Sequence, residues 1–178
     1  MHLAREIPAN ARVLDIGSGD GSIAAAVMAQ RSDVDITGVD VLVRKNTRIP
    51  VVPYDGVSLP FEDSSFDAVS LVDVLHHTDD PFAVLAEAIR VAPIVIVKDH
   101  LTHGLFALTT LRAMDWAGNV QHGVRLPYNY LSEEEWRSGI ASLGLSIHTW
   151  KTELKIYSPW LSWWFDRRLH VLFSICRT

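Results

Sequence analysis

A strand-like segment that ends in a carboxylate is followed at once by a glycine-rich turn. The stretch VLDIGSGDGS runs from Val13 to Ser22 and contains Asp15, Gly17 and Gly19. A glycine loop after a first strand is typical of dinucleotide sites, where the backbone N–H groups of a helix N-terminus meet a pyrophosphate. A carboxylate two residues before the first glycine would repel such an anion at low dielectric. The stretch therefore favours a cationic ligand over a diphosphate.

Two further acids end the next two strand-like segments. Asp40 ends DITGVD, and Asp55 with Gly56 follows IPVVPY. A carboxylate at the end of a second strand can accept both hydroxyls of a ribose, and one after the third could accept from an adenine amine. Three acids at three strand ends suit a ligand with an ammonium, a ribose and an adenine, and S-adenosylmethionine is such a ligand. The alternative is local: Asp40 and Asp55 would then be ordinary turn residues.

Several histidines could act as general bases, since an imidazole exchanges protons near neutral pH. His76 and His77 follow the fourth strand-like segment, His100 and His103 follow the fifth, and His122 comes later. Each could instead be structural, bonded to backbone groups after its strand. Adjacent side chains rarely point at one ion, and no carboxylate pattern completes a ligand set around His76 and His77. We therefore predict no metal site.

The composition is that of a soluble globular protein. The 178 residues carry a net charge of −5, which argues against nucleic-acid binding because that needs a dense cationic surface. No signal peptide and no apolar run long enough to span a bilayer is visible, so we expect a cytoplasmic protein. The single cysteine, Cys176, lies in an apolar run and is predicted to be a buried strand residue.

Strand-like and helix-like segments alternate along the chain, which is typical of a mainly parallel sheet with helices on both faces. We predict one α/β domain over residues 1–178, a doubly wound seven-stranded sheet with helices between the first five strands and an antiparallel last strand. Pro50 and Pro53 assign the third strand to a sheet edge, because proline cannot donate to a central ladder. The predicted strands cover residues 12–16, 35–40, 49–54, 66–72, 93–99, 145–154 and 169–177.

Helix boundaries are marked by capping residues. Asp80 can cap a helix that has Pro81 in its first turn. Ser132 and Glu135 form a capping-box pattern, and the helix they open should stop at Gly144. In such a sheet the ligand lies beyond the carboxyl ends of the strands, near the point where the strand order reverses. The first strand and its glycine loop should mark that point.

Successive segments resemble the motifs of class I S-adenosylmethionine-dependent methyltransferases, especially the small-molecule branch. They are VLDIGSGDGSIA, GVD, YDGVSLPFEDSSFDAVSLVDVLHHTDDPFAVLAEAIRV and PIVIVKD, in order between residues 12 and 98. The resemblance implies a Rossmann-like fold, S-adenosylmethionine as cofactor and methyl transfer by in-line displacement. It also implies the cofactor-binding residues Asp15, Gly17, Ser18, Gly19, Asp40, Val41, Asp55, Gly56, Leu71 and Val72.

The roles implied by the resemblance follow the ligand from end to end. The two glycines, Gly17 and Gly19, let the backbone approach the methionine moiety, and Asp15 serves its amino group directly or through water. Asp40 holds the ribose. The pair Asp55–Gly56 borders the adenine, and residues 71–73 line the methionine side. His76, His77 and His100 are the general-base candidates.

Two departures from the family pattern stand out. The Pro-Gly-Gly turn that usually precedes the fifth strand is missing, since Arg90 runs through two residues into Pro93. The chain also begins about eleven residues before its first strand, where family members usually carry one or two helices that cover the cofactor. The first departure shortens a surface loop, and the second bears on the completeness of the site.

The acceptor side is expected in the segments after the fifth strand. Residues 100–131 are predicted to be an inserted substrate-side segment. The run YSPWLSWWFDRR, residues 157–168, would be an apolar lid or a membrane-contacting patch for a lipid-like acceptor, or a loop folded on the sheet edge. Arg167 and Arg168 could then meet anionic head groups or face water.

Three functions remain open on these residues. The first is methyl transfer from S-adenosylmethionine to a small, apolar or lipid-like acceptor, with a homodimer as one arrangement. The second is a cofactor-binding subunit that serves a partner chain. The third is an NAD-dependent oxidoreductase, against which Asp15 and the serine at the sixth position of the loop both argue.

Overall fold

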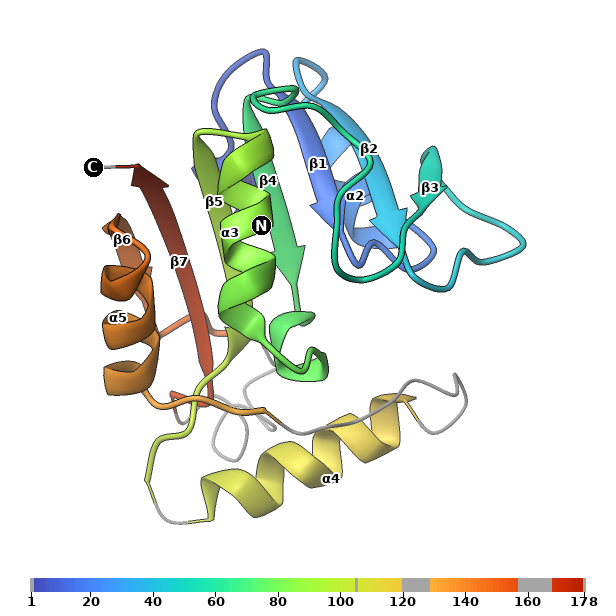
Figure 1. Cartoon of the computed structure of the whole chain (residues 1–178). Helices are drawn as coiled ribbons and strands as arrows, with labels where there is room; N and C mark the ends of the chain where they lie inside the picture. Colours follow the sequence, from blue (N-terminus) through green and yellow to red (C-terminus); the bar gives the residue numbers. More distant parts are fainter. Residues whose placement is uncertain (1, 105, 120–128, 157–167, 178) are drawn as a thin grey trace.

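The computed structural model describes residues 2–104, 106–119, 129–156 and 168–177, and places seven strands in one sheet (Figure 1). The strand order is β3-β2-β1-β4-β5-β7-β6, and neighbouring strands from β3 to β5 are parallel. β7 runs antiparallel to both β5 and β6. The strands are β1 (Arg12–Ile16), β2 (Asp35–Asp40), β3 (Val51–Pro53), β4 (Ala68–Val72), β5 (Ile94–His100), β6 (Leu145–Lys151) and β7 (His170–Arg177).

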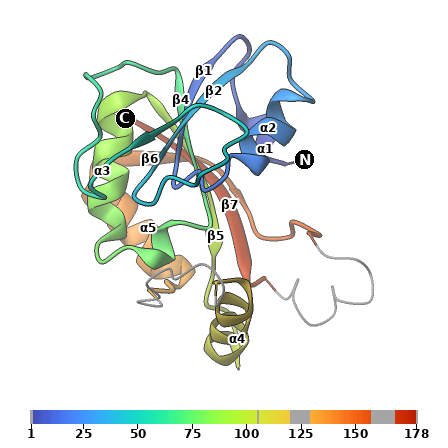
Figure 2. The ribbon, with the colours of Figure 1, turned by 90° about the vertical axis from the view of Figure 1, so that its right-hand side faces the viewer.

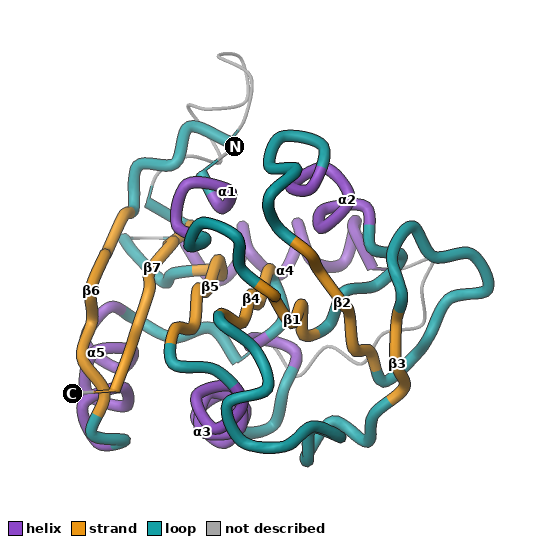
Figure 3. Tube along the Cα trace, turned by 90° about the horizontal axis from the view of Figure 1, so that it is seen from above, coloured by secondary structure: helices purple, strands orange, loops and turns teal. Residues whose placement is uncertain are grey.

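Helices cover both faces of the sheet, as predicted. α1 and α2 lie over one face, and α3 and α5 lie over the other (Figure 3). α4 lies beyond the carboxyl ends of the parallel strands (Figures 1 and 2). The helices are α1 (Leu3–Glu6), α2 (Ser22–Met28), α3 (Pro81–Val91), α4 (Ala107–Asn119) and α5 (Glu133–Ser142), with a 3-10 turn, η1 (Leu75–His77), after β4.

The central strands form because they are apolar on both faces. Val13, Leu14 and Ile16 of β1 are at most 1% exposed, and the central part of β5 is equally covered. A strand buried on both sides has no polar alternation, which is the pattern of a parallel strand between two helical layers. β3 lies at the sheet edge and has only three residues, which confirms the prediction made from Pro50 and Pro53.

The capping residues act as the sequence predicts. The Asp80 carboxylate accepts from the N–H groups of Phe82 and Ala83, and Pro81 is at the first position of α3. Ser132 and Glu135 form a complete capping box at the start of α5. That helix ends at Ser142, two residues before Gly144, whose φ of +69° is favourable for glycine. These caps fix where α3 and α5 begin, and thereby where the turns before them lie.

One prediction about the connections is wrong. Helices were expected between all of the first five strands, but residues 41–50 and 54–67 form loops with no helix. Pro50, Pro53 and Pro60, together with the Asp55–Gly56 turn, interrupt any helical pattern there. The loops have a consequence for the site, because both of them stand beside the carboxyl ends of β2 and β3.

No helix in the described ranges combines the length and the apolar character that crossing a bilayer requires. Cys176 is in β7, as predicted, but it is half-buried rather than buried. The reason is its place near the end of β7, next to the exposed Arg177.

Candidate functional site

A cavity of about 720 Å³ opens beyond the carboxyl ends of β1, β2 and β4. β1 lies between β2 and β4, so the strand order reverses at this point, where open α/β sheets bind ligands. The volume is in the range of small-molecule sites. The cavity wall includes eight of the residues predicted from the sequence: Gly17, Gly19, Asp40, Val41, Asp55, Gly56, Asp73 and His77.

The glycine loop between β1 and α2 approaches the turn after β4 closely. Gly17 has a φ of +69°, and a Cβ atom built on it would lie 2.6 Å from Cγ2 of Val74. Both the backbone conformation and the contact require glycine. This close approach brings the backbone of the loop and the start of η1 together as one wall of the cavity.

The backbone N–H groups of the loop are bonded inside the protein. Gly17 and Ser18 donate to the carbonyl oxygen of Val39 at 2.8 and 3.2 Å. Gly19 donates to Oδ2 of Asp40 at 2.8 Å. A pyrophosphate cradle needs such N–H groups to point at the ligand. The loop is therefore not arranged for a diphosphate, which answers the question that the sequence raised.

The charge of the cavity points the same way. Among its described lining residues Arg44 is the one guanidinium, and there is no lysine. Opposing it is a surplus of carboxylates, which makes the cavity strongly acidic and favours a cationic guest. The carboxylates are those of Asp40, Asp55, Asp73, Asp79 and Asp80.

Asp40 and Asp55 are held by backbone N–H groups. Besides the glycine loop, Asp40 accepts from the N–H of Leu42 at 2.8 Å, and each of its oxygens keeps a second lone pair for a ligand hydroxyl. Asp55 accepts from the N–H groups of Val57 and Ser58, both at 2.8 Å. These bonds lower the pKa of Asp55. Asp55 is thus a turn residue and a cavity residue at once.

Asp15 lies beneath the loop instead of on the cavity wall. Asp15 is 5% exposed, and its carboxylate accepts from the Ser70 hydroxyl at 2.6 Å. Burial raises the pKa of Asp15 to about 6, against the Ser70 hydrogen bond, and the charge of Asp40 raises it further. The side chain is not among those that line the cavity, and its contact with the ligand, direct or through water, stays a prediction.

Three other predicted cofactor residues also lie away from the wall. The Ser18 hydroxyl is buried against β2 and has no hydrogen-bond partner in the described part of the chain. Leu71 is fully buried in the core, and Val72 packs on the opposite face of the sheet. Asp73, which was predicted together with them, does line the cavity, and so does the following residue, Val74. Side chains reach the cavity only after β4 has ended.

The three histidines predicted as bases occupy two environments. His77 is at the cavity wall, whereas His76 and His100 are buried beside it. Nδ1 of His76 lies 2.6 Å from Oδ1 of Asp99. The same carboxylate accepts from the N–H groups of Leu75 at 2.8 Å and of His100 at 2.6 Å. The histidines are therefore organised around one buried acid.

Asp99 is ionised despite its burial. Desolvation alone would raise its pKa, but the charges and hydrogen bonds of His76 and His100 hold the pKa well below its usual range. An ionised carboxylate can only accept, so Nδ1 of His76 donates to Asp99, and this hydrogen bond fixes the orientation of the ring. This arrangement of acid and imidazole is the one that enzymes use to fix a histidine tautomer.

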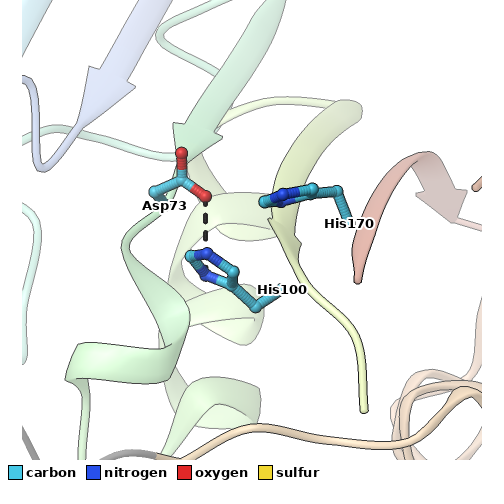
Figure 4. Close-up of side chains that lie close together, drawn as sticks. All are labelled: Asp73, His100 and His170. Carbon is cyan, nitrogen blue, oxygen red and sulfur yellow. Dashed lines mark ion pairs between the residues drawn. The ribbon is translucent and has the colours of Figure 1, made fainter. Parts of the chain in front are cut away.

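A second charged group adjoins the first at the cavity wall. Both oxygens of Asp73 accept from Nζ of Lys98, at 2.6 and 2.7 Å, and Nδ1 of His170 lies 3.4 Å from the same Nζ. Nδ1 of His100 lies 3.7 Å from Asp73 (Figure 4). The antiparallel register pairs His100, at the end of β5, with His170, at the start of β7, so the two rings lie side by side where these strands end and begin.

A short segment after α4 covers the histidines. The backbone N–H of Asn129 donates to the carbonyl oxygen of His76, and its side-chain amide donates to that of Thr78 at 2.6 Å. The Tyr130 ring is 8% exposed and stacks on His76 with centroids 5.6 Å apart. This part of the predicted segment 100–131 therefore lies over the candidate bases.

Sequence reasoning gave no role to Lys98, Asp99 or His170. The signal that could have found the first two is the polar triplet KDH at the end of an otherwise apolar strand. His103 is exposed, and Arg168 pairs with Glu153 at 3.6 Å. His122, residues 157–166 and Arg167 lie outside the described residues.

The sequence matches a known family over most of its length. Residues 1–149 match the family described as a methyltransferase domain. The chain belongs to that family. The chain also shares its fold with solved structures at low sequence identity. One is from the complex between the Haloferax volcanii Trm112 methyltransferase activator and a methyltransferase, with a TM-score of 0.74 and 18% identity, covering 98% of this chain and 87% of that one.

Another is an S-adenosylmethionine-dependent methyltransferase from Mesorhizobium loti, with a TM-score of 0.70 and 15% identity over 99% of this chain and 96% of that one. Curated relatives are enzymes that methylate small molecules. The chain is 38% identical over 104 residues to the 27-O-demethylrifamycin SV methyltransferase of Amycolatopsis mediterranei, covering 50% of this chain and 38% of that protein. It is 29% identical over 136 residues to the demethylmenaquinone methyltransferase of Renibacterium salmoninarum, covering 68% and 57%.

Proposed function

We propose that this methyltransferase transfers the methyl group of S-adenosylmethionine to a small, apolar acceptor. The observation that carries the proposal is the acidic cavity at the strand-order reversal, bordered by a glycine loop whose N–H groups are already bonded. A cofactor with a sulfonium and an ammonium suits a cavity wall whose carboxylates outnumber its cations even with Asp73 paired to Lys98, whereas a diphosphate does not. The small-molecule methyltransferases among the relatives support the acceptor class.

The lining residues fit the parts of that cofactor. The lone pairs left on Asp40 would accept from the ribose hydroxyls, and Asp55 with Gly56 would border the adenine. Gly17 and Gly19 would face the methionine portion, with Asp73 close to its ammonium. When bound, the cofactor supplies a methyl carbon activated by a positively charged sulfur. The chain must then align an acceptor with that carbon, and alignment is worth roughly 7–11 kcal/mol in favourable cases.

A hydroxyl acceptor would also need to lose a proton. His77 is the predicted base that reaches the cavity wall, so we assign proton removal to its imidazole. The His76 ring lies beneath it, with centroids 3.9 Å apart, and is fixed by Asp99. The segment with Asn129 and Tyr130 covers the His76 ring, whereas His77 stays accessible from the cavity.

A cofactor-binding subunit that acts with a partner chain is the second candidate. It is favoured by exposed apolar side chains at the cavity rim, where Val41 is 65%, Leu42 51% and Val57 71% exposed. Such side chains could contact a partner instead of water. Transfer of labelled methyl groups to small molecules of a cell extract, by the purified chain alone, would remove this second candidate.

Calorimetry tests the cofactor directly. The wild-type chain should bind S-adenosylmethionine in the micromolar range, and Asp40→Ala should weaken binding at least about tenfold, the loss of roughly 1.4 kcal/mol expected for charge-assisted hydrogen bonds. Asp35→Ala removes an exposed acid from the same strand and should bind as the wild type does. Absence of any cofactor binding, or equal binding of NADH, would contradict the proposal.

A further inference from the structure

Three side chains beside the cavity form a donor set typical of a metal site. Asp73 follows β4, His100 ends β5 and His170 begins β7, and one ligand atom from each lies within 4.8 Å of the other two (Figure 4). Both histidines are buried, and Asp73 is partly exposed at the cavity wall. Two imidazoles and one carboxylate are the ligands that bind first-row transition metals.

A positive charge already stands among these donors. The Lys98 side chain is 16% exposed, and its Nζ lies 2.6 and 2.7 Å from the Asp73 oxygens and 3.4 Å from Nδ1 of His170. The ammonium thus contacts two of the three donors at hydrogen-bond distance. A divalent ion and an ammonium in one poorly solvated group would repel each other strongly.

Lys98 also fixes the backbone at Asp73. Asp73 has a φ of +56°, a conformation that is uncommon for residues other than glycine. Its N–H donates to the carbonyl oxygen of Lys98 at 2.8 Å, while its carboxylate accepts from the Lys98 ammonium. Asp73 is therefore attached to Lys98 through both its backbone and its side chain, and this holds it at the cavity wall.

We propose that Lys98 is the resident cation of the ligand set Asp73, His100 and His170. The lysine takes the position that a divalent transition metal would have, neutralises Asp73 and fixes its conformation. Removal of the ammonium converts the same three side chains into a site for a divalent metal ion. The neighbouring group of His76, Asp99 and His100 does not serve this purpose, because Asp99 is already engaged by Leu75, His76 and His100.

The test needs neither cofactor nor acceptor, so its outcome is independent of the proposed function. Chelator-treated wild type and Lys98→Ala are titrated with Co²⁺ at fixed neutral pH, followed by visible absorbance and calorimetry. Lys98→Ala should bind one equivalent at least tenfold more tightly than the wild type. The double variant Lys98→Ala/His170→Ala should lose this binding. Lys151→Ala removes a lysine that is paired with Glu6, away from the histidines, and should behave as the wild type.

Two results would overturn the proposal. One is a wild type that binds Co²⁺ as tightly as Lys98→Ala and loses it in His170→Ala, since the native cation would then be a metal. The other is a folded Lys98→Ala that binds no more tightly than Lys151→Ala, since no ligand set would then exist. Lys98→Gln, which keeps most of the side-chain length, gives the same comparison if Lys98→Ala does not fold, as judged by circular dichroism.

Discussion

Replacing the buried acid beneath the glycine loop should stabilise the protein at neutral pH. Asp15 has a pKa raised from its ordinary 3.8 to about 6, so the folded state holds its proton more tightly than the unfolded state does. At pH 7 the folded protein must bury an ionised Asp15, and stability falls as the pH rises through this window. At roughly 1.4 kcal/mol for each pKa unit, the cost above pH 7 is about 3 kcal/mol.

The perturbation is Asp15→Asn, whose side-chain oxygen can still accept from Ser70. Urea unfolding of both proteins is measured at several pH values, and the difference in unfolding free energy between them is compared, because other titrating groups then cancel. The unfolding free energy of Asp15→Asn minus that of the wild type should increase by about 1.4 kcal/mol as the pH rises from 5 to 7.5. Asp35→Asn, at an exposed acid, controls for the loss of a charge. A difference that stays constant or shrinks over this range would refute the reasoning.

Two further changes test the loop and the buried acid. Gly17→Ala should lower the free energy of unfolding by about 1–2 kcal/mol because of its positive φ, and by about 1–3 kcal/mol more because its Cβ would contact Val74. Gly144→Ala has the same φ of +69° and no atom within 4 Å, so it should show only the first loss in thermal unfolding. Equal losses in the two variants would show that the contact with Val74 is unimportant. Asp99→Asn leaves His76 without its buried partner and should cost about 3–5 kcal/mol at pH 7 by urea unfolding. Because the pKa of Asp99 is lowered in the folded state, this difference should persist as the pH falls to about 4, the ordinary pKa of an aspartate, and should narrow only below it; a difference that narrows already between pH 7 and pH 5 would contradict the assignment.

The sequence was sufficient for features set by local chemistry. Asp80 and Ser132 cap helices through their own hydrogen bonds to nearby N–H groups, so neither needs information from distant parts of the chain. Pro50 and Pro53 exclude a central strand wherever the rest of the sheet lies. The glycine loop and Asp40 could be placed at the cavity because they follow the carboxyl ends of β1 and β2, where this fold binds its ligand.

What the sequence could not give depends on side-chain direction and on distant pairing. Asp15 and Asp40 both sit at a strand end in the sequence, yet one is buried against Ser70 and the other faces the cavity. Alternation alone does not decide this, because the loop that follows each strand selects which side chain remains covered. His170 is 70 residues from His100 and meets it only through the antiparallel register of β7.

The position of β7 inside the sheet imposes an order of events during synthesis. β6 pairs only with β7 in the described sheet, yet β7 is made after it and must insert between β5 and β6. Until β7 has been synthesised, one edge of β5 is unpaired and β6 has no strand to join. Such exposed edges attract other chains. The synthesis of β7 therefore supplies both missing partners at once, because this one strand pairs with β5 on one side and with β6 on the other.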